Sequence, residues 1–319
     1  MILPHTIGLE LVRATEAAAI IAGKWMGLGR AEESDLAAAT AMYEILNTFS
    51  VQADIVVGEE LKFTSEAVIH SHQHLGSATS GLVDLIVDPI DGRTQLSKGF
   101  PGVLSVAAVA PHNTMWRAEG CRYIEKIIVG QDVAKYLVPE CIDAPAAWTL
   151  ALVARAKGVD VSDLIVFVLD RERHVDLINE IRATGAHVLL RSDGDIGGAL
   201  MVGTPKSGVD LLMGTGGSME GVLAACAIKA MGGAMFVRPD PQSAEESNSL
   251  RNAGLELDRI LSIDDLVLGD EIFFAATGIT DSPILMGVVY HGDRAETDSL
   301  VLRSETQTRR HIKAEHLIR

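Results

Sequence analysis

The sequence has few cysteines and no long apolar run. Its three cysteines, Cys121, Cys141 and Cys226, are odd in number, widely spaced and without a Cys-x-x-Cys pair. This pattern argues against a disulfide framework and against a zinc site, and we expect reduced, buried thiols. Mean hydropathy is +0.23. Charged residues nevertheless interrupt every Ala-rich stretch well before the roughly 18 consecutive apolar residues of a membrane span. We therefore expect a soluble protein with no membrane partner.

Positive charge is also scarce. Lys and Arg total 27 against 43 Asp and Glu, so the formal net charge is -16. A surface of that charge repels a phosphate backbone, which makes nucleic acid a poor candidate partner. The first ten residues lack the basic start and apolar middle of a signal peptide, so we expect a cytoplasmic protein. The 319 residues, 48% of them hydrophobic, suffice for a large core in one domain or two lobes.

Hydrophobic periodicity predicts an α/β protein. Helical patterns open the chain at 9–26 and 37–46, and β-rich runs follow at 54–57, 82–87, 103–109 and 123–129. Strands and helices then alternate: strand 164–169, helix 175–183, strand 187–190, helix 196–202, strand 209–213 and helix 219–231. Such alternation is typical of a parallel sheet with helices on its faces. Further strands are expected at 271–277, 284–290 and 300–303, and 240–256 is expected to be an acidic, partly helical surface segment.

The change of pattern predicts two lobes. We expect an N-terminal lobe, residues 1–145, with an antiparallel-rich sheet and four of the five acids considered below as metal ligands. A C-terminal βαβα lobe, residues 146–319, is expected to bind the ligand, and its last strands can return to the first lobe. A cleft between two lobes is a common place for a ligand, so we expect the site there.

The most informative stretch is 82–92, an apolar run that ends in Asp88, Pro89, Asp91 and Gly92. The proline restrains the backbone and the glycine permits a sharp turn, so both carboxylates can converge on one point. Two converging carboxylates repel unless a proton or a cation lies between them. Mg²⁺ and Mn²⁺ prefer such oxygen ligands. The same dipeptides are ordinary turn chemistry, so from this stretch alone a turn with solvated acids is the more frequent outcome.

Three further acids lie at comparable positions. Glu59 follows the run 54–57, Asp35 lies at the start of the second helical pattern, and Glu220 lies in the glycine-rich segment 214–221 between a strand and a helix. Each acid by itself is more often a helix cap or a surface residue, because carboxylates are favoured in the first turn of a helix. Together with the pair at 88 and 91, they strengthen the case for a metal site.

Seven segments in order carry a family resemblance. They are Leu-Val-Arg-Ala-Thr-Glu-Ala-Ala-Ala at 11–19, Val-Asp-Pro-Ile-Asp-Gly at 87–92, Tyr-Ile-Glu-Lys at 123–126, Asp-Arg-Glu-Arg-His at 170–174, Ser-Asp-Gly-Asp at 192–195, Gly-Thr-Gly-Gly-Ser-Met-Glu-Gly at 214–221 and Phe-Phe-Ala-Ala-Thr-Gly-Ile-Thr-Asp at 273–281. With them nearly the whole chain resembles the class II fructose-1,6-bisphosphatases, of the lithium-sensitive, metal-dependent sugar phosphatase superfamily. The resemblance implies an α/β fold of alternating α-β-α-β-α layers. It also implies direct hydrolysis of the 1-phosphate of fructose 1,6-bisphosphate or a related sugar bisphosphate, as in gluconeogenesis.

The resemblance also implies the residues of the site. The family's ligands for Mn²⁺ or Mg²⁺ match Asp35, Glu59, Asp88, Asp91 and Glu220. Its sugar-phosphate contacts match Asp91, Gly92, Tyr123, Arg171, Arg173, Asp193, Asp195 and Gly217, and the position that Arg93 occupies here. The residues implied to act on the attacking water are Asp91, Arg93 and Thr94. The guanidinium groups of Arg171 and Arg173 can each donate two hydrogen bonds to the phosphate that is not cleaved. The implied partners are a small-molecule sugar phosphate and further copies of the chain, as a dimer or tetramer.

Position 93 departs from the family motif. The family has Asp-Pro-Ile-Asp/Glu-Gly-Thr, in which the threonine hydroxyl orients the attacking water, whereas this chain has Arg93 followed by Thr94. A guanidinium has no acceptor and cannot take a proton from water. Two hypotheses stay open. The first is an active or slowed sugar bisphosphatase in which Arg93 binds phosphate and Thr94 substitutes. The second is a catalytically impaired paralogue that binds a sugar phosphate as a regulatory or assembly protein.

Overall fold

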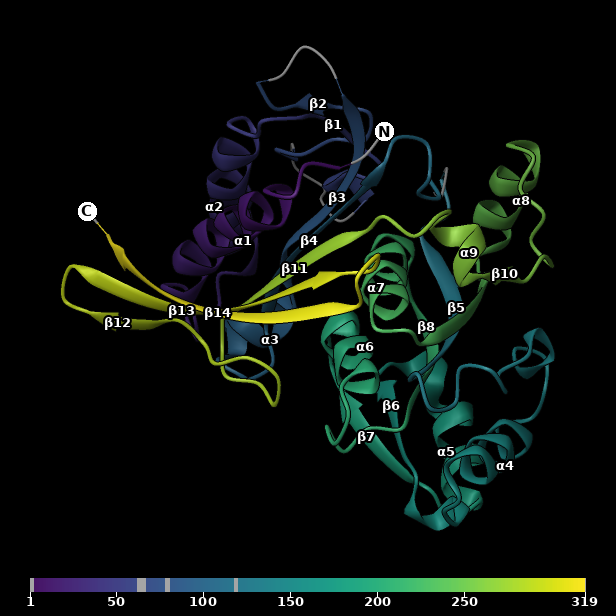
Figure 1. Cartoon of the computed structure of the whole chain (residues 1–319). Helices are drawn as coiled ribbons and strands as arrows, with labels where there is room; N and C mark the ends of the chain where they lie inside the picture. The colour runs from purple at the N-terminus through teal and green to yellow at the C-terminus, as the bar shows by residue number, and fades with distance from the viewer. Residues whose placement is uncertain (1–2, 62–66, 78–80, 118–119, 319) are drawn as a thin grey trace. The chain divides into compact units, whose positions relative to one another are not determined.

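The computed structural model describes residues 3–61, 67–77, 81–117 and 120–318 (Figure 1). The chain divides into two compact units, which we call unit 1 (Met1–Trp116 with Leu268–Arg319) and unit 2 (Arg117–Val267). Unit 2 is therefore contiguous in the sequence, whereas unit 1 is assembled from the two ends of the chain.

Unit 1 is one sheet with helices packed on it. Its helices are α1 (Ile7–Gly23), α2 (Ala31–Leu46), η1 (Glu59–Leu61) and α3 (Arg93–Lys98). Its strands are β1 (Gln52–Ile55), β2 (His74–Leu75), β3 (Leu82–Asp91), β4 (Leu104–Pro111), β11 (Phe273–Gly278), β12 (Val289–His291), β13 (Arg294–Arg303) and β14 (Thr308–Leu317). In the part of the chain described, the strand order is β12-β13-β11-β4-β3-β1-β2, with β14 also paired to β13. The β1–β3 pair is parallel and the other pairs are antiparallel.

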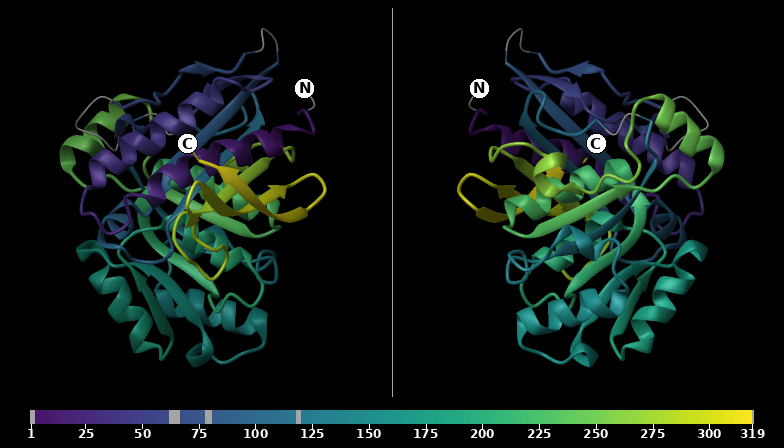
Figure 2. Two further views of the ribbon diagram at one scale, coloured as in Figure 1. Left: turned by 90° about the vertical axis from the view of Figure 1, so that its left-hand side faces the viewer. Right: turned by 90° about the vertical axis from the view of Figure 1, so that its right-hand side faces the viewer.

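Helix α1 packs directly on the sheet of unit 1. Its buried face repeats Ile7, Leu11, Ala18 and Ala22 at helical spacing, and the small alanines let the helix backbone approach the strands closely. The buried hydroxyl of Thr15 lies 2.7 Å from that of Thr277 and so joins α1 to β11. Figure 2 shows the C-terminal hairpin, in yellow, beside α1, in purple. The two ends of the chain thus share one core.

Strand β3 lies in the middle of the sheet and is buried from Val83 to Asp91. This agrees with the continuous apolar run predicted for a central strand. The pairing of β3 with β4 shifts register between Asp88 and Asp91. Pro89 lies inside this shift and has no N–H to give to the ladder, so the strand bulges there. Gly92 follows at φ 104°, in the left-handed region, and starts α3.

Unit 2 is a second mixed sheet. Its helices are η2 (Pro139–Cys141), α4 (Ala146–Lys157), η3 (Val161–Asp163), η4 (Glu172–His174), α5 (Val175–Ala183), α6 (Asp195–Gly203), α7 (Ser218–Ala230), α8 (Ala244–Asn252) and α9 (Ile263–Leu266). Its strands are β5 (Tyr123–Val129), β6 (Ile165–Leu169), β7 (His187–Arg191), β8 (Leu211–Gly217), β9 (Ala234–Pro239) and β10 (Leu261–Ser262). Among the described residues their order is β10-β9-β5-β8-β6-β7.

Helices cover both faces of this sheet. Val166 and Val168 of β6 share a buried cluster with Leu150 of α4 and Ile181 of α5. The alternate residue of β6, Phe167, faces α6 on the other side, where Figure 1 shows α6 and α7 opposite α4 and α5. This alternation is the period of two expected for a strand with helices on both faces.

The predicted α/β class is confirmed, with two corrections. The sheet of unit 2 is parallel only at β6–β7 and β6–β8, because β5 and β9 join it antiparallel. The glycine pair at 232–233 turns the chain after α7, so β9 runs back beside β5. The strand expected at 284–290 is also wrong, since only Val289–His291 is extended in the sheet. Ser282 instead closes a turn with the backbone of Leu285.

Two further expectations concern cysteines and membranes. Cys121, Cys141 and Cys226 are all buried free thiols. No helix among the described residues is long and apolar enough to cross a bilayer.

Candidate functional site

Four of the acids predicted as metal ligands lie buried in unit 1. The exposed fractions are 2% for Asp35, 0% for Glu59, 1% for Asp88 and 3% for Asp91. Carboxylates are almost never this deeply buried unless a partner neutralises them. Burial at four separate positions therefore favours a functional interpretation over four surface caps.

Sheet topology brings the elements that carry these acids to one edge. Strands β1 and β3 run parallel, Ile55 pairs with Leu85, and the N–H of Val56 donates to the carbonyl of Leu85 at 2.9 Å. The segment after β1, which leads into Glu59 at the start of η1, therefore leaves the sheet at the same edge as the last residues of β3. Asp88 and Asp91 lie on those last residues.

Arg93 joins a third element to this edge. It is the first residue of α3, directly after the left-handed Gly92, and its Nη1 donates to Oδ2 of Asp35 on α2 at 3.2 Å. The side chain of Asp35 is 3% exposed and that of Arg93 is 32% exposed. The neighbouring Thr94 is half-buried, and its carbonyl accepts from Oγ of Ser97 at 2.9 Å. Arg93 therefore contacts one of the predicted metal ligands.

These residues fit a hard divalent cation. Carboxylate oxygens are the ligands that Mg²⁺ and Mn²⁺ prefer. Four such carboxylates lie buried in unit 1, and a cation lowers the cost of burying negative charge. The fifth predicted ligand, Glu220, lies in unit 2, in the first turn of α7. Its carboxylate lies against Gly217, where a Cβ would collide with it.

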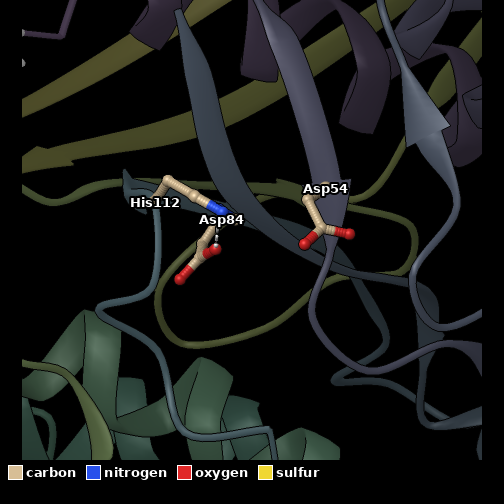
Figure 3. Close-up of side chains that lie close together, drawn as sticks. All are labelled: Asp54, Asp84 and His112. Carbon is tan, nitrogen blue, oxygen red and sulfur yellow. Dashed lines mark hydrogen bonds and ion pairs between the residues drawn. The ribbon is translucent and has the colours of Figure 1, made fainter.

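A further group with metal-ligand chemistry lies on the same two strands, near the start of β3. Asp54 of β1 and Asp84 of β3 pair across the parallel ladder, and His112 follows β4 (Figure 3). Ligand atoms of the three residues all lie within 4.8 Å of one another, and both aspartates are buried. This group could hold a metal ion.

The contacts of Asp84 show a second role for this group. One of its oxygens accepts from the backbone N–H groups of Thr114 and Met115, both at 2.9 Å, and the other lies 3.1 Å from Nδ1 of His112. The carboxylate thus holds the turn after β4 in place. The group was missed from the sequence. The available sign was an aspartate inside each of two apolar strand patterns, at 54 and 84.

In unit 2 the structure brings together three of the predicted sugar-phosphate residues. The β5–β8 register places Tyr123 opposite Gly217. The guanidinium of Arg173 lies over the Tyr123 ring, 5.0 Å from its centre, and its Nη2 donates to the carbonyl of Thr215 at 3.0 Å. A guanidinium has five N–H donors, so the bond to the Thr215 carbonyl leaves other N–H groups of Arg173 available to a phosphate. Stacking holds the fork of Arg173 in one plane.

A second pair of predicted residues lies at the carboxyl ends of β6 and β7. Arg171 and Asp193 are 3.8 Å apart, with side chains 38% and 28% exposed. The N–H of Asp170 donates to the carbonyl of Arg191 at 2.7 Å, which joins the two chain segments. The carboxyl ends of parallel strands are a recurrent place for ligands in α/β sheets.

Asp195 has a partner that the sequence analysis missed. Nζ of Lys126 donates to Oδ2 of Asp195 at 2.5 Å, and the side chain of Lys126 is 1% exposed. Gly216 passes beside the pair, where a Cβ would collide with both side chains. Asp195 is therefore fixed by a buried cation. The sign for Lys126 was a lysine inside the apolar run 123–129, since lysine is almost never fully buried unless it is paired.

His174 lies beside this pair. Its Nδ1 bonds the carbonyl of Leu169 at 2.7 Å, and its Nε2 accepts from the N–H of Thr215 at 2.8 Å. Burial lowers the pKa of His174, and the positive charges of Arg173 and Lys126 lower it further. The ring is therefore neutral, with its proton on Nδ1.

The mixed α/β fold is consistent with a sugar phosphatase, and the buried acids suit a divalent cation. The chain belongs to the family described as bacterial fructose-1,6-bisphosphatase, glpX-encoded, whose model matches residues 5–316. It is 35% identical to the class 2 fructose-1,6-bisphosphatase of Haemophilus influenzae, over 98% of this chain and 97% of that protein. Two Synechococcus proteins, each a D-fructose 1,6-bisphosphatase class 2/sedoheptulose 1,7-bisphosphatase, are 33% identical over 98% of this chain and 96% of their own length.

Proposed function

We propose that this chain is a phosphoric monoester hydrolase that removes the 1-phosphate of fructose 1,6-bisphosphate, the reaction of gluconeogenesis. The observation that carries the proposal is the 33–35% identity to class 2 fructose-1,6-bisphosphatases over 98% of the chain. Two of those relatives are also named sedoheptulose 1,7-bisphosphatases, so the seven-carbon bisphosphate is the second substrate to test.

The acids supply the metal-binding part of the proposal. The proposed ligands are Asp35, Glu59, Asp88, Asp91 and Glu220, and the proposed ion is Mn²⁺ or Mg²⁺. When bound, such an ion neutralises phosphoryl oxygens and lowers the pKa of a coordinated water. The deep burial of the four acids in unit 1 supports this role, because a bound cation reduces the free-energy cost of burying carboxylates.

Unit 2 supplies the proposed binding groups for the part of the substrate that does not react. Arg171 and Arg173 bind the phosphate that is retained, with the fork of Arg173 held by the Tyr123 ring and the Thr215 carbonyl. Asp193 accepts from a sugar hydroxyl. At the start of α7, after Gly217, the N–H of Ser218 donates to the carbonyl of Arg122, so the proposed donors to an anion are the N–H groups that follow Ser218. Asp195 is held by Lys126 for the same purpose.

Residues after β3 act on the reacting end in this proposal. Asp91 accepts the hydrogen bond of the attacking water at a carboxylate oxygen and so turns a lone pair of the water toward phosphorus. The hydroxyl of Thr94 takes the orienting position that the family gives to the preceding residue. Arg93 and Gly92 donate to the phosphoryl oxygens as negative charge develops on them.

We further expect a homo-oligomer in the cytoplasm.

The test measures inorganic phosphate released from fructose 1,6-bisphosphate with Mn²⁺ or Mg²⁺. Glu59→Gln should lose more than about 100-fold in rate, because a metal ligand is lost. Glu44→Gln is the matched control, since Glu44 is exposed on α2, and its rate should equal that of the unaltered protein. If the unaltered protein binds Mn²⁺ and releases no phosphate from either bisphosphate, the proposal fails and an impaired paralogue is the better description.

A further inference from the structure

We infer that the guanidinium of Arg93 takes the place of one divalent cation among the acids at the β1–β3 edge, so that this chain binds one metal ion fewer than the same acids would hold without it. The inference rests on the proposed function in one respect, that the acids at the β1–β3 edge form the metal site, and it removes Asp35 from the ligands of that site for as long as Arg93 is present. It concerns the number of ions bound and not the reaction.

The first step of the argument is the contact itself. Nη1 of Arg93 lies 3.2 Å from Oδ2 of Asp35. A metal ion on that carboxylate would lie about 2.1 Å from its oxygen, so ion and guanidinium would sit within about 5 Å of one another. The guanidinium is permanently charged, and this repulsion cannot be relieved by loss of a proton. The guanidinium and a metal ion therefore compete for Asp35.

The second step is that the fold holds Arg93 in this position. Its backbone follows Gly92, whose carbonyl accepts from the N–H of Leu96 at 2.9 Å and so closes the first turn of α3. The N–H of Gly27 donates to the carbonyl of Leu96 at 2.9 Å, and that of Gly29 donates to Ser97 at 3.0 Å. The chain between α1 and α2 is thereby bound to α3. The arginine stem starts from a fixed point beside α2.

The third step is charge. Asp35 is 2% exposed and therefore needs a cation nearby. The guanidinium supplies one positive charge that is covalently part of the chain. A metal ion would supply two positive charges and can exchange with the solvent. The ion pair thus neutralises Asp35 within the chain. The resemblance implies a threonine at this position, where this chain has Arg93.

The experiment counts bound Mn²⁺ per chain by equilibrium dialysis and by the electron paramagnetic resonance signal of the free ion. The variant Arg93→Thr should bind one more Mn²⁺ per chain than the unaltered protein, because Asp35 is released as a ligand. Arg93→Gln, which keeps most of the side-chain volume, should gain the same ion, and Arg93→Lys should not. Asp35→Asn added to Arg93→Thr should abolish the gain. Circular dichroism confirms that each variant is folded.

Lys98→Thr is the matched control. Lys98 is exposed at the far end of the same helix, so this variant removes one positive charge from α3 without touching Asp35. Its Mn²⁺ count should equal that of the unaltered protein. Equal counts in Arg93→Thr, Arg93→Gln and the unaltered protein would overturn the inference, as would an equal gain in Lys98→Thr. The Mn²⁺ count is made without substrate, so it is independent of the phosphate-release assay. If Arg93→Thr gains an ion but the unaltered protein releases no phosphate, the proposed function fails and this inference holds. If the unaltered protein releases phosphate but the Mn²⁺ counts of the variants are unchanged, this inference fails and the proposed function holds.

Discussion

At the scale of single residues, His174 shows how burial and geometry fix a protonation state. Nδ1–H donates to the Leu169 carbonyl, and Nε2 accepts from the N–H of Thr215. A second proton on Nε2 would face that N–H donor, and it would add a charge beside Arg173 and Lys126. Burial and these neighbours lower the pKa of His174 in the folded chain. The unfolded chain has the ordinary value, about 6.5.

This difference in pKa predicts the direction of a pH effect on stability. Below about pH 6.5 the unfolded chain takes up a proton that the folded chain does not, so the free energy of unfolding falls as the pH drops. Above that pH both states are neutral at His174 and its contribution is constant. Urea denaturation at pH 5, 6, 7 and 8 measures it. His174→Gln should be less stable at pH 7 and should show a shallower fall toward pH 5. An equal fall in both proteins would contradict the assignment.

Residue chemistry also decided how far the site could be foreseen. The acids at 88 and 91 were recognisable because a proline and a glycine mark where the strand stops. Lys126 was not, because its importance lies in a partner 69 positions away, Asp195. The apolar run around Lys126 indicates that the lysine is buried, but the identity of its partner has no local pattern, since it depends on which strand lies under which helix.

At the scale of elements, α6 lies close to β6 because one helical residue has no side chain. A Cβ at Gly198 would collide with the ring of Phe167, with ring atoms 2.6 to 2.8 Å away. Glycine in the middle of a helix costs about 1 kcal/mol relative to alanine. The helix carries a glycine at position 198 despite this cost, because the missing side chain permits α6 and β6 to approach closely.

Gly198→Ala should therefore lower the free energy of unfolding by about 1–3 kcal/mol, the usual cost of overpacking a core. Helix propensity alone predicts the opposite sign. Phe167→Leu makes room at the same place, so in its background Gly198→Ala should cost less or become stabilising. Urea denaturation of the four proteins of this double-mutant cycle measures the coupling. Independent effects of the two substitutions would show that no collision occurs.

The type and order of helices and strands were predicted well where the apolar period of each segment identifies it. The helices and strands from Ile165 to Ala230 appear in the predicted order, because each repeats an apolar period of its own. Pairing direction was predicted less well. The β5–β8 and β5–β9 pairs are antiparallel, and nothing within β5 expresses which strands it will meet.

At the scale of the whole molecule, the two units differ in how the chain builds them. Unit 2 runs without interruption from Arg117 to Val267 and has a buried cluster of its own between its sheet, α4 and α5. Unit 1 needs both ends of the chain, since β4 pairs with β11 and β11 with β13. A contiguous unit with its own core has the anatomy of a domain that can fold alone.

Residues 117–267, expressed alone, should therefore unfold cooperatively in urea with a far-ultraviolet circular dichroism spectrum of a mixed α/β protein. Residues 1–116 alone should not, because β4 would lack its partner β11 and present an unpaired, apolar edge that promotes aggregation. Size-exclusion chromatography compares the two fragments. A monomeric, cooperatively folding 1–116 together with an unfolded 117–267 would contradict this division.

The sequence by itself determined the α/β class, most of the elements and the family, because apolar period and short motifs are local properties that each segment carries with it. It also pointed to position 93, where the resemblance implies a threonine and the chain has arginine. Only the tertiary structure decided what contacts what: Arg93 with Asp35, Lys126 with Asp195, and Asp54 with Asp84 and His112. Each of these contacts joins segments far apart in the chain. The physical reason is that sheet register and helix packing set such distances, and both arise from the energy of the whole core.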